Sequence, residues 1–344
     1  MSGKWAVTGA SIAMYLVFAG STEAARAQDR TEFYKGKTIT ITIGFNPGGN
    51  YDFVGRLVSR HIGKQLPGNP NGVGVNMAGA GSFRAANYLF NAAPKDGTML
   101  GIVSSSIAIE EALGTKGVNY KSAEFNWIGR VSFILQVLTT YGNSKTRRIE
   151  DALTNETPMA GTGPGSPSEG YPKVLNGVLG TRFKVVSGYR SSTEGMLAME
   201  KGEVDGGLPS WNNIKRSRTH WIAEKKAYPL VQFVFERHPD LPNVPTSVEL
   251  AKTPADRAVL AFYTSSEELG RSIIAPPGVP ADRIKLLRQA FDAMLKDKAF
   301  LAEVEKTKLE FNPLSGETMQ KLVADTAATP KDVIERTRNL LGRK

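Results

Sequence analysis

A glycine-rich turn between an expected strand and an expected helix is the part of this chain best suited to bind a ligand. The strand covers residues 38–43, the turn covers 44–49, and apolar residues recur at helical spacing from 53 to 62. Backbone N–H groups at a helix start lack intrahelical acceptors and lie at the positive end of the helix dipole. The turn therefore predicts a site for an anion. Its candidate ligand contacts are Phe45, Pro47, Gly48, Gly49, Asn50, Tyr51 and Asp52.

Two further glycine-rich turns lie at corresponding places later in the chain. Residues 77–82 precede a helix expected at 83–92, and residues 161–169 precede another helix. Ligands of open α/β sheets bind beyond the carboxyl ends of the strands, so we expect these turns to face one crevice. The candidates outside the first turn are Gly79, Ala80 and Gly81; Ser104 and Ser105 after a strand expected at 98–103; Thr162, Gly163, Ser166 and Ser168; and Tyr189, Arg190 and Asp205.

Each candidate also has a purely structural interpretation. Asp52 either complements the positive end of the helix dipole or orients the amides of the turn. Tyr189 is either a core tyrosine or a ligand contact. Arg190 either points to solvent or forms a fork with a carboxylate, for which it is the best-placed cation. Ser166 or Ser168 is the expected N-cap of the helix that follows the third turn.

The order of the expected elements indicates two α/β domains. Strands separated by helices of about ten to fifteen residues are typical of βαβ units and a mostly parallel sheet. The apolar run 127–141 predicts a strand that leaves the first domain, and amphipathic helices are expected at 282–297 and 317–341. We therefore predict an α/β clamshell with chain crossovers between two lobes. Domain 1 comprises residues 28–130 and 272–344, and domain 2 comprises residues 131–271.

Residues 1–27 have the pattern of a secretory signal peptide. Lys4 gives a basic start, an apolar stretch follows, and Ala25-Arg26-Ala27 forms a small-x-small cleavage site. An uncleaved N-terminal anchor is the alternative interpretation. The chain has no cysteine, which excludes disulfides, thiolate metal sites and a lipid-modified cysteine. We expect the mature protein to reside in the periplasm.

The charge and the histidines limit the partners of the protein. The formal net charge is +10, and removal of residues 1–27 lowers it by one because they hold Lys4, Arg26 and Glu23. Such a balance favours acidic small molecules, or simply colloidal solubility. The basic residues are dispersed and the chain is expected to be exported, so nucleic acid is not an expected partner. The three histidines, His61, His220 and His238, are far apart in the sequence. We expect no metal and no cofactor.

Enzyme motifs are absent from the glycine-rich turns. The turn from Gly44 to Gly49 lacks the Lys and the Ser or Thr that complete a phosphate-binding P-loop. The segment from Gly161 to Ser166 does not fit the Gly-x-Ser-x-Gly nucleophile elbow. We therefore expect a protein that is not an enzyme. An exported hydrolase stays as an alternative, because a catalytic triad is assembled in space and has no fixed sequence order.

Motifs along the whole mature chain resemble one family, the substrate-binding proteins of tripartite tricarboxylate transporters, also called Bug-type receptors. The first loop, the turn at 77–82 and the second-domain loop each have a counterpart in that family. In chain order the motifs are Gly44-Phe45-Asn46-Pro47-Gly48-Gly49-x-x-Asp52, Met77 to Ser82, Pro94-Lys95-Asp96-Gly97-Thr98-x-x-Gly101, Gly161-Thr162-Gly163-x-x-Ser166, Tyr189 with Gly202-x-Val204-Asp205-Gly206, Pro245-Thr246-x-x-Glu249, and Ile274 to Pro280.

The resemblance implies a Venus-flytrap protein that captures a di- or tricarboxylate or an aromatic acid and delivers it to a membrane permease. We expect it to act as a monomer. This chain departs from the family pattern at Asn50-Tyr51, at Asn76-Met77-Ala78 and at 191–194, so the identity of the acid is open. A periplasmic sensor that binds ligand and docks on a signalling kinase is the alternative role.

Overall fold

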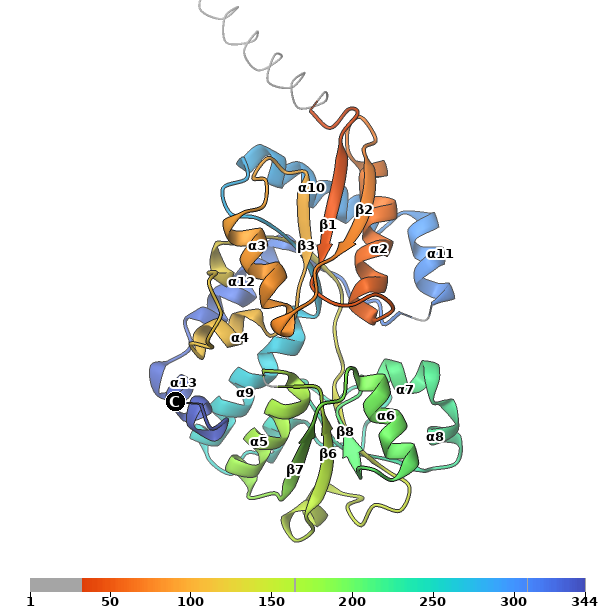
Figure 1. Cartoon of the computed structure of the whole chain (residues 1–344), viewed down its shortest axis with the longest axis vertical. Coiled ribbons are helices and arrows are strands. Elements are labelled where there is room, and N and C mark those ends of the chain that lie inside the picture. Colours follow the sequence, from red (N-terminus) through yellow and green to blue (C-terminus); the bar gives the residue numbers. More distant parts are fainter. Residues whose placement is uncertain (1–32, 164, 308, 344) are drawn as a thin grey trace, which may run out of the picture.

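Two lobes lie one above the other along the long axis of the computed structural model (Figure 1). Each lobe is built on one β-sheet, with six strands in the first and five in the second. The structure describes residues 33–163, 165–307 and 309–343. The predicted signal peptide at residues 1–27 lies outside the described residues. Among the described helices, none is long and apolar enough to cross a membrane.

The sheet of the first lobe combines parallel and antiparallel strands. The isoleucines of β1 are all fully buried, because β1 lies inside the sheet between β2 and β3 and is parallel to both. The next strand, β10, is antiparallel to β3 and β4. The strand order is β11 (Leu314–Ser315), β4 (Asn126–Ser132), β10 (Arg271–Ala275), β3 (Met99–Ile102), β1 (Thr38–Ile43) and β2 (Asn71–Asn76).

Helices cover both faces of this sheet. Val54 and Leu57 of one helix pack with Phe291 of another against one face, and Leu89 and Met319 pack against the other. The first face is covered by α2 (Asn50–Ile62), α10 (Ala281–Met294) and α11 (Lys298–Lys306), and the second by α3 (Phe83–Asn91), α4 (Ile107–Ala112) and α12 (Gly316–Ala327).

The second lobe repeats this layered arrangement. Tyr171 and Phe233 stack in its core on one side of the sheet, whereas Trp211 and Trp221 are buried on the other. The strand order is β7 (Phe183–Ser187), β6 (Thr157–Gly161), β8 (Gly206–Gly207), β5 (Val137–Tyr141) and β9 (Ala227–Gln232). The helices are α5 (Pro167–Leu179), α9 (Pro254–Leu269) and α13 (Lys331–Leu340) on one side, and α6 (Ser192–Lys201), α7 (Trp211–Ser217) and α8 (Thr219–Ala223) on the other.

Local capping explains where several helices begin. The Thr253 side chain accepts a hydrogen bond from the N–H of Asp256, and Pro254 occupies the first turn of α9, where its missing N–H costs no helical bond. Ser191 caps α6 and Ser315 caps α12 in the same way. Of these three helix starts, that of α6 faces the space between the lobes.

The apolar run 127–141 forms two strands, whereas the sequence predicted one. Residues up to Ser132 form β4 in the first sheet, and residues from Val137 form β5 in the second. Both strands are buried on both faces, so hydrophobicity does not mark the break between them. Residues 133–136 therefore form the first crossover between the lobes.

Gly270 forms the second crossover, between α9 and β10. Its φ of +50° is in the region that favours glycine. A Cβ at this position would overlap the backbone carbonyl of Ser132 and approach Phe133 closely. The two crossovers therefore touch, and only a residue without a side chain permits it.

The C-terminal helices differ from the expectation for residues 317–341. Pro330 separates α12 from α13, because a proline disfavours helical backbone in the residue before it. The last helix packs against α9 and α5 beside the second lobe, and Leu341 joins that lobe's core (Figure 1). This packing differs from the predicted grouping of residues 272–344 with domain 1. Ile109 of α4 and Leu113 directly after this helix join the same cluster, which therefore extends across both lobes along one edge.

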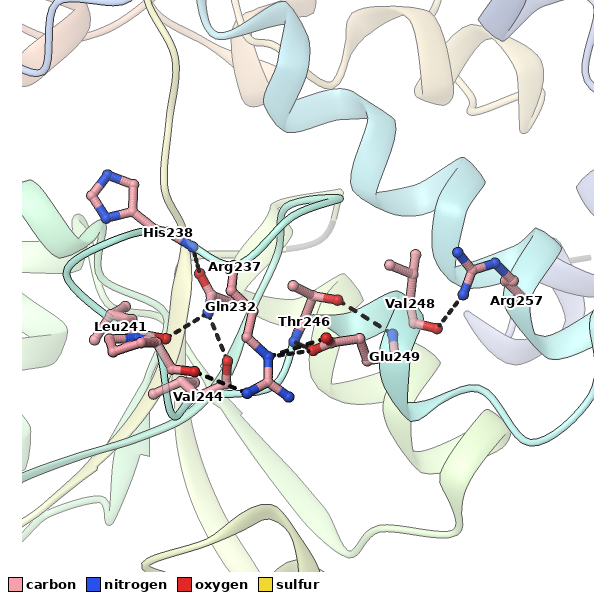
Figure 2. Close-up of polar contacts among 10 residues, drawn as sticks. Gln232, Arg237, His238, Leu241, Val244, Thr246, Val248, Glu249 and Arg257 are labelled. Atoms are coloured by element: carbon pink, nitrogen blue, oxygen red, sulfur yellow. Dashed lines mark hydrogen bonds and ion pairs between the residues drawn. The ribbon is translucent and has the colours of Figure 1, made fainter.

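A long loop after β9 reaches from the second lobe to the first. Figure 2 shows Gln232 holding it: its Nε2 donates to the carbonyls of Leu241 and Val244, and its Oε1 accepts from the N–H of His238. The imidazole of His238 then lies 3.0 Å from the Glu310 carboxylate, which precedes β11 of the first lobe. The loop is thus a fixed bridge between the lobes.

Candidate ligand-binding site

A cavity of about 340 Å³ lies between the lobes. The first lobe contributes the residues that follow β1 and β3, and the second contributes those that follow β6 and β7. The crossovers supply Ile134, Gln136 and Arg271. The full lining is Phe45, Asn46, Pro47, Gly49, Asn50, Tyr51, Ser104, Ser105, Ile134, Gln136, Thr162, Pro167, Ser168, Arg190, Ser191, Ser192, Leu208, Ser210 and Arg271.

Asp52 fastens the first loop beneath the cavity. Its carboxylate accepts hydrogen bonds from the N–H of Gly48 at 2.9 Å, from the amide of Asn76 at 2.8 Å and from Arg56 at 2.9 Å. Burial disfavours the charged carboxylate, but these three donors together lower the pKa of Asp52 below its usual value. The side chain therefore orients the loop, and the Gly48 N–H is already used.

Phe45 and Tyr51 stack on each other at the wall of the cavity. Their ring centroids are 4.2 Å apart and the rings are nearly parallel. The Tyr51 hydroxyl accepts a hydrogen bond from the N–H of Ser105 at 3.1 Å. The pair links the loops after β1 and β3 into one wall, and no ligand ring fits between the two side chains.

The second lobe presents a wall of hydroxyl groups. The Ser168 hydroxyl accepts from the N–H of Thr162 at 3.0 Å and contacts the hydroxyls of Thr162 and Ser166 at 2.9 Å. Ser191 and Ser192 begin α6 and also line the cavity. These groups offer both donors and acceptors to a ligand.

Three helices begin at the cavity. Gly49 and Asn50 begin α2, Pro167 begins α5, and Ser192 begins α6. The starts of α2 and α5 have no side-chain capping bond. Their free N–H groups and dipoles give the cavity a positive potential.

The charged groups of the lining are both cations. Arg190 is exposed at the rim on the second lobe, and Arg271 is buried at the crossovers. Among the described residues, no aspartate or glutamate lines the cavity. A third cation, Arg216 of α7, crosses the mouth and donates to the side-chain oxygen of Asn50 at 3.1 Å. The geometry therefore suits an anion held between the lobes.

The structure places the predicted residues in two groups. Phe45, Pro47, Gly49, Asn50, Tyr51, Ser104, Ser105, Thr162, Ser168 and Arg190 line the cavity. Gly48, Asp52, Gly79, Ala80, Gly81, Gly163, Ser166, Tyr189 and Asp205 do not.

The second group has identifiable structural positions. Tyr189 packs against the core of the second lobe. Asp205 lies at the end of the sheet opposite to the cavity. Its N–H donates to the carbonyl of Pro158, near the start of β6, whereas the cavity lies beyond the end of β6. Gly79 to Gly81 form an exposed turn with positive φ throughout.

Sequence reasoning missed the residues of the crossovers. Gln136 and Arg271 are the polar members of this set, and Ser210 begins α7 nearby. One signal was present, because Arg271 opens an otherwise apolar strand and a charge at such a position needs a reason. The missed lining residues are Asn46, Ile134, Gln136, Pro167, Ser191, Ser192, Leu208, Ser210 and Arg271.

Acidic and histidine side chains do not gather into a metal centre. Within the described residues, no group of three or more such side chains is placed to hold an ion. His61 contacts Glu303 at 2.8 Å and His238 contacts Glu310, so both are engaged in pairs away from the cavity.

Two α/β lobes joined by crossovers around a cavity are the fold of two-lobed periplasmic binding protein structures. Residues 54–340 match the family model described as "Tripartite tricarboxylate transporter family receptor". The chain belongs to this family, which confirms the family and the fold predicted from the motifs. The description of the family model identifies its members as receptors of tripartite tricarboxylate transporters.

The chain is also similar to individual proteins. A "UPF0065 protein in tcbD-tcbE intergenic region" of Pseudomonas sp. (strain P51) is 25% identical over 278 residues, covering 79% of this chain and 77% of that protein. The structure of MatC from Rhodopseudomonas palustris with bound malate has a TM-score of 0.66 at 22% identity and covers 87% of this chain and 99% of that one. An R. palustris protein with adipate has a TM-score of 0.67 at 19% identity, covering 89% and 98%.

Proposed function

We propose that this protein captures an organic carboxylate between its lobes and delivers it to a membrane permease. The observation that carries the proposal is the charge of the cavity: Arg190 and Arg271 line it, three helices begin at it, and no acid among the described residues does so. Two structurally similar proteins hold malate and adipate, which are carboxylates of this kind. The mature protein works in the periplasm as a monomer, after export by the signal peptide at residues 1–27.

The stacked aromatic pair favours one class of acid over another. Phe45 and Tyr51 occupy each other's faces, so they do not sandwich an aromatic ligand. The cation at the floor and the cation at the rim instead suit an acid that carries charge at both ends. Among the candidate acids, this favours di- and tricarboxylates over aromatic acids.

Isothermal titration calorimetry of the metal-free mature protein tests the proposal. The panel comprises succinate, malate, adipate, citrate, benzoate and terephthalate, with succinamide as the uncharged control. We expect binding of at least one aliphatic acid and none of the diamide. A folded protein that binds no acid of the panel would contradict the proposal.

Two alternative roles have separate tests. Permease genes beside the gene of this protein favour uptake, whereas a kinase gene favours a sensor. Turnover of a generic ester by the purified protein would support an exported hydrolase. We expect no turnover. Among the described residues, no histidine lines the cavity, so its hydroxyl groups have no histidine base there.

A further inference from the structure

Arg271 is a buried cation that forms no ion pair within 4.0 Å among the described residues. Its side chain is at the floor of the cavity and the residue is 5% exposed. Nη1 donates to the hydroxyl of Ser132 and to the carbonyl of Phe133, both at 3.2 Å. Nε is buried and has no partner among the described residues. A donor of a charged group is thus left unused at the wall of a cavity.

Arg130 on the neighbouring strand shows what a structural arginine looks like in this chain. It is 3% exposed, close to the value for Arg271. Its Nε and Nη2 donate to Asn312, and its Nη1 forms an ion pair with Glu268 at 3.2 Å. The difference between the two arginines therefore lies in their partners and not in their burial.

The acids nearest to Arg271 do not neutralise it. Burial raises the pKa of Glu267 to about 8, against the effects of the Tyr171 hydroxyl and the charge of Arg271, so this carboxyl is neutral at pH 7. Glu310 is paired with His238 at 3.0 Å. The Tyr51 ring lies 5.6 Å from the guanidinium and offers only a weak attraction. A buried charge left in this state is costly, and an anion in the cavity would relieve that cost.

The other crossover presents a second unpartnered group. Gln136 lines the same cavity, and its side-chain oxygen is buried without a hydrogen-bond partner among the described residues. Its backbone carbonyl accepts from Phe233, and its N–H donates to Ile134, so the residue itself is held in place. Both unpartnered groups thus lie where the chain passes between the lobes. The Gln136 oxygen is an acceptor, so it suits a hydroxyl or N–H group of a ligand, whereas the Arg271 donor suits a carboxylate.

We propose that Arg271 binds one carboxylate of the ligand at the floor of the cavity and so determines which acids the protein accepts. This inference rests on the proposed function. The ligand is held first at the crossovers, and its other end extends toward Arg190 and the helix starts at the rim. An acid must then present a carboxylate slim enough to reach the floor, and a neutral end group at that place is rejected.

Calorimetry on variants tests the assignment with the tightest acid of the panel as probe. The variants are Arg271→Met, Arg271→Lys, and Arg182→Gln, an exposed arginine outside the cavity that controls for net charge. We expect Arg271→Met to bind about 100-fold more weakly, Arg271→Lys to fall between it and wild type because it keeps the charge but loses the fork, and Arg182→Gln to match wild type. The melting temperature of ligand-free Arg271→Met should not fall, whereas a structural arginine would lower it.

Each result decides the inference. Affinity of Arg271→Met within threefold of wild type overturns the assignment of Arg271 and leaves the proposed function standing. Absence of binding by the wild-type protein to every acid contradicts the proposed function itself. If Arg271→Met does not fold, a crystal structure of the wild-type protein with the probe decides instead. A carboxylate oxygen within hydrogen-bond distance of Nε or Nη2 supports the inference, and one elsewhere overturns it.

Discussion

Asp52 and Arg271 are buried charged residues near the same cavity, and their surroundings differ in one respect. Three donors satisfy the carboxylate of Asp52, and these hydrogen bonds hold the first loop in place. Arg271 keeps Nε unpartnered. A buried charge that is fully paired serves the fold, whereas one that is left unpaired at a cavity indicates a ligand.

The backbone conformation of Gly48 favours a residue without a side chain, whereas that of Gly49 does not. Gly48 has a φ of +90°, and Gly49 has a φ of −84° that any residue adopts. We expect Gly48→Val to destabilise the protein by about 1–2 kcal/mol and to weaken acid binding about tenfold, because the strained loop displaces the start of α2. Gly49→Ala, the matched control, should keep the stability of wild type. Thermal denaturation and calorimetry measure both effects; wild-type affinity in Gly48→Val would show that the turn is only architectural.

Glu267 predicts a pH dependence of stability. Burial raises its pKa from 4.5 to about 8 in the folded protein. Between these values the folded state binds a proton that the unfolded state has lost, so the free energy of unfolding falls as pH rises, by about 1.4 kcal/mol per pH unit. Glu267→Gln should remove this slope and be more stable than wild type at pH 8, with no advantage below about pH 4.5.

Chemical denaturation across pH 4–8 checks this prediction. Glu156→Gln is the control, because Glu156 is exposed and pairs only with Lys184 at the surface. It should keep the slope of wild type. Equal slopes in wild type and Glu267→Gln would mean that Glu267 is ionised in the folded protein at neutral pH.

The first turn shows what residue patterns can predict about a site. Five of the residues predicted at this turn and at the start of the helix after it line the cavity, because strand, turn and helix are contiguous in sequence: Phe45, Pro47, Gly49, Asn50 and Tyr51. Arg271 and Gln136 could not be found in this way. Their position depends on where two distant crossovers meet, and that meeting is set by tertiary packing around Gly270.

At the scale of elements, α7 and α2 hold the mouth of the cavity together. Arg216 of α7 donates to Asn50 of α2 across the lobes. We expect Arg216→Ala to increase the rate of acid release about three- to tenfold, since one interlobe hydrogen bond is lost, and to change the association rate little. Stopped-flow dissociation measures the rate.

Lys215 provides the control on the same helix. It pairs with Asp240 of its own lobe at 2.6 Å, whereas Arg216 is the residue that bonds to Asn50. Lys215→Ala should therefore release the acid at the rate of wild type. If both variants release it equally fast, the interlobe bond is not what retains the ligand.

Elements whose sequence alternates or repeats at helical spacing were predictable, whereas the division of a continuous apolar run into two strands was not. The strand at 38–43 and the helix at 83–92 appear within a residue of their expected ends, because alternation and helical spacing mark them. The run 127–141 is apolar throughout, so its division into β4 and β5 leaves no trace in the pattern. The prediction of a helix over 317–341 did not take Pro330 into account, although this proline indicates the break between α12 and α13.

At the scale of the molecule, an acid bound by both lobes should favour the closed form. Ligand shifts such an equilibrium only through its higher affinity for one state, and contacts to Arg190 on one lobe and α2 on the other would supply it. We expect hinge rotation near 128–134 and 266–274. Small-angle scattering should show a smaller radius of gyration with saturating acid, and an unchanged distance distribution would point to a rigid site.

The hydrophobic cluster that extends from α4 through α9 to α5 and α13 binds the molecule along one edge (Figure 1). A rotation that keeps this edge packed uses the edge as its axis. The separation between a point on one lobe and a point on the other then changes in proportion to their distance from that edge. A pair of fluorophores on α12 and α13 would report almost no change on binding, whereas a pair on α11 and α8, at the opposite edge, would give the largest signal. This bound edge therefore decides where a biosensor built on the protein has to carry its dyes.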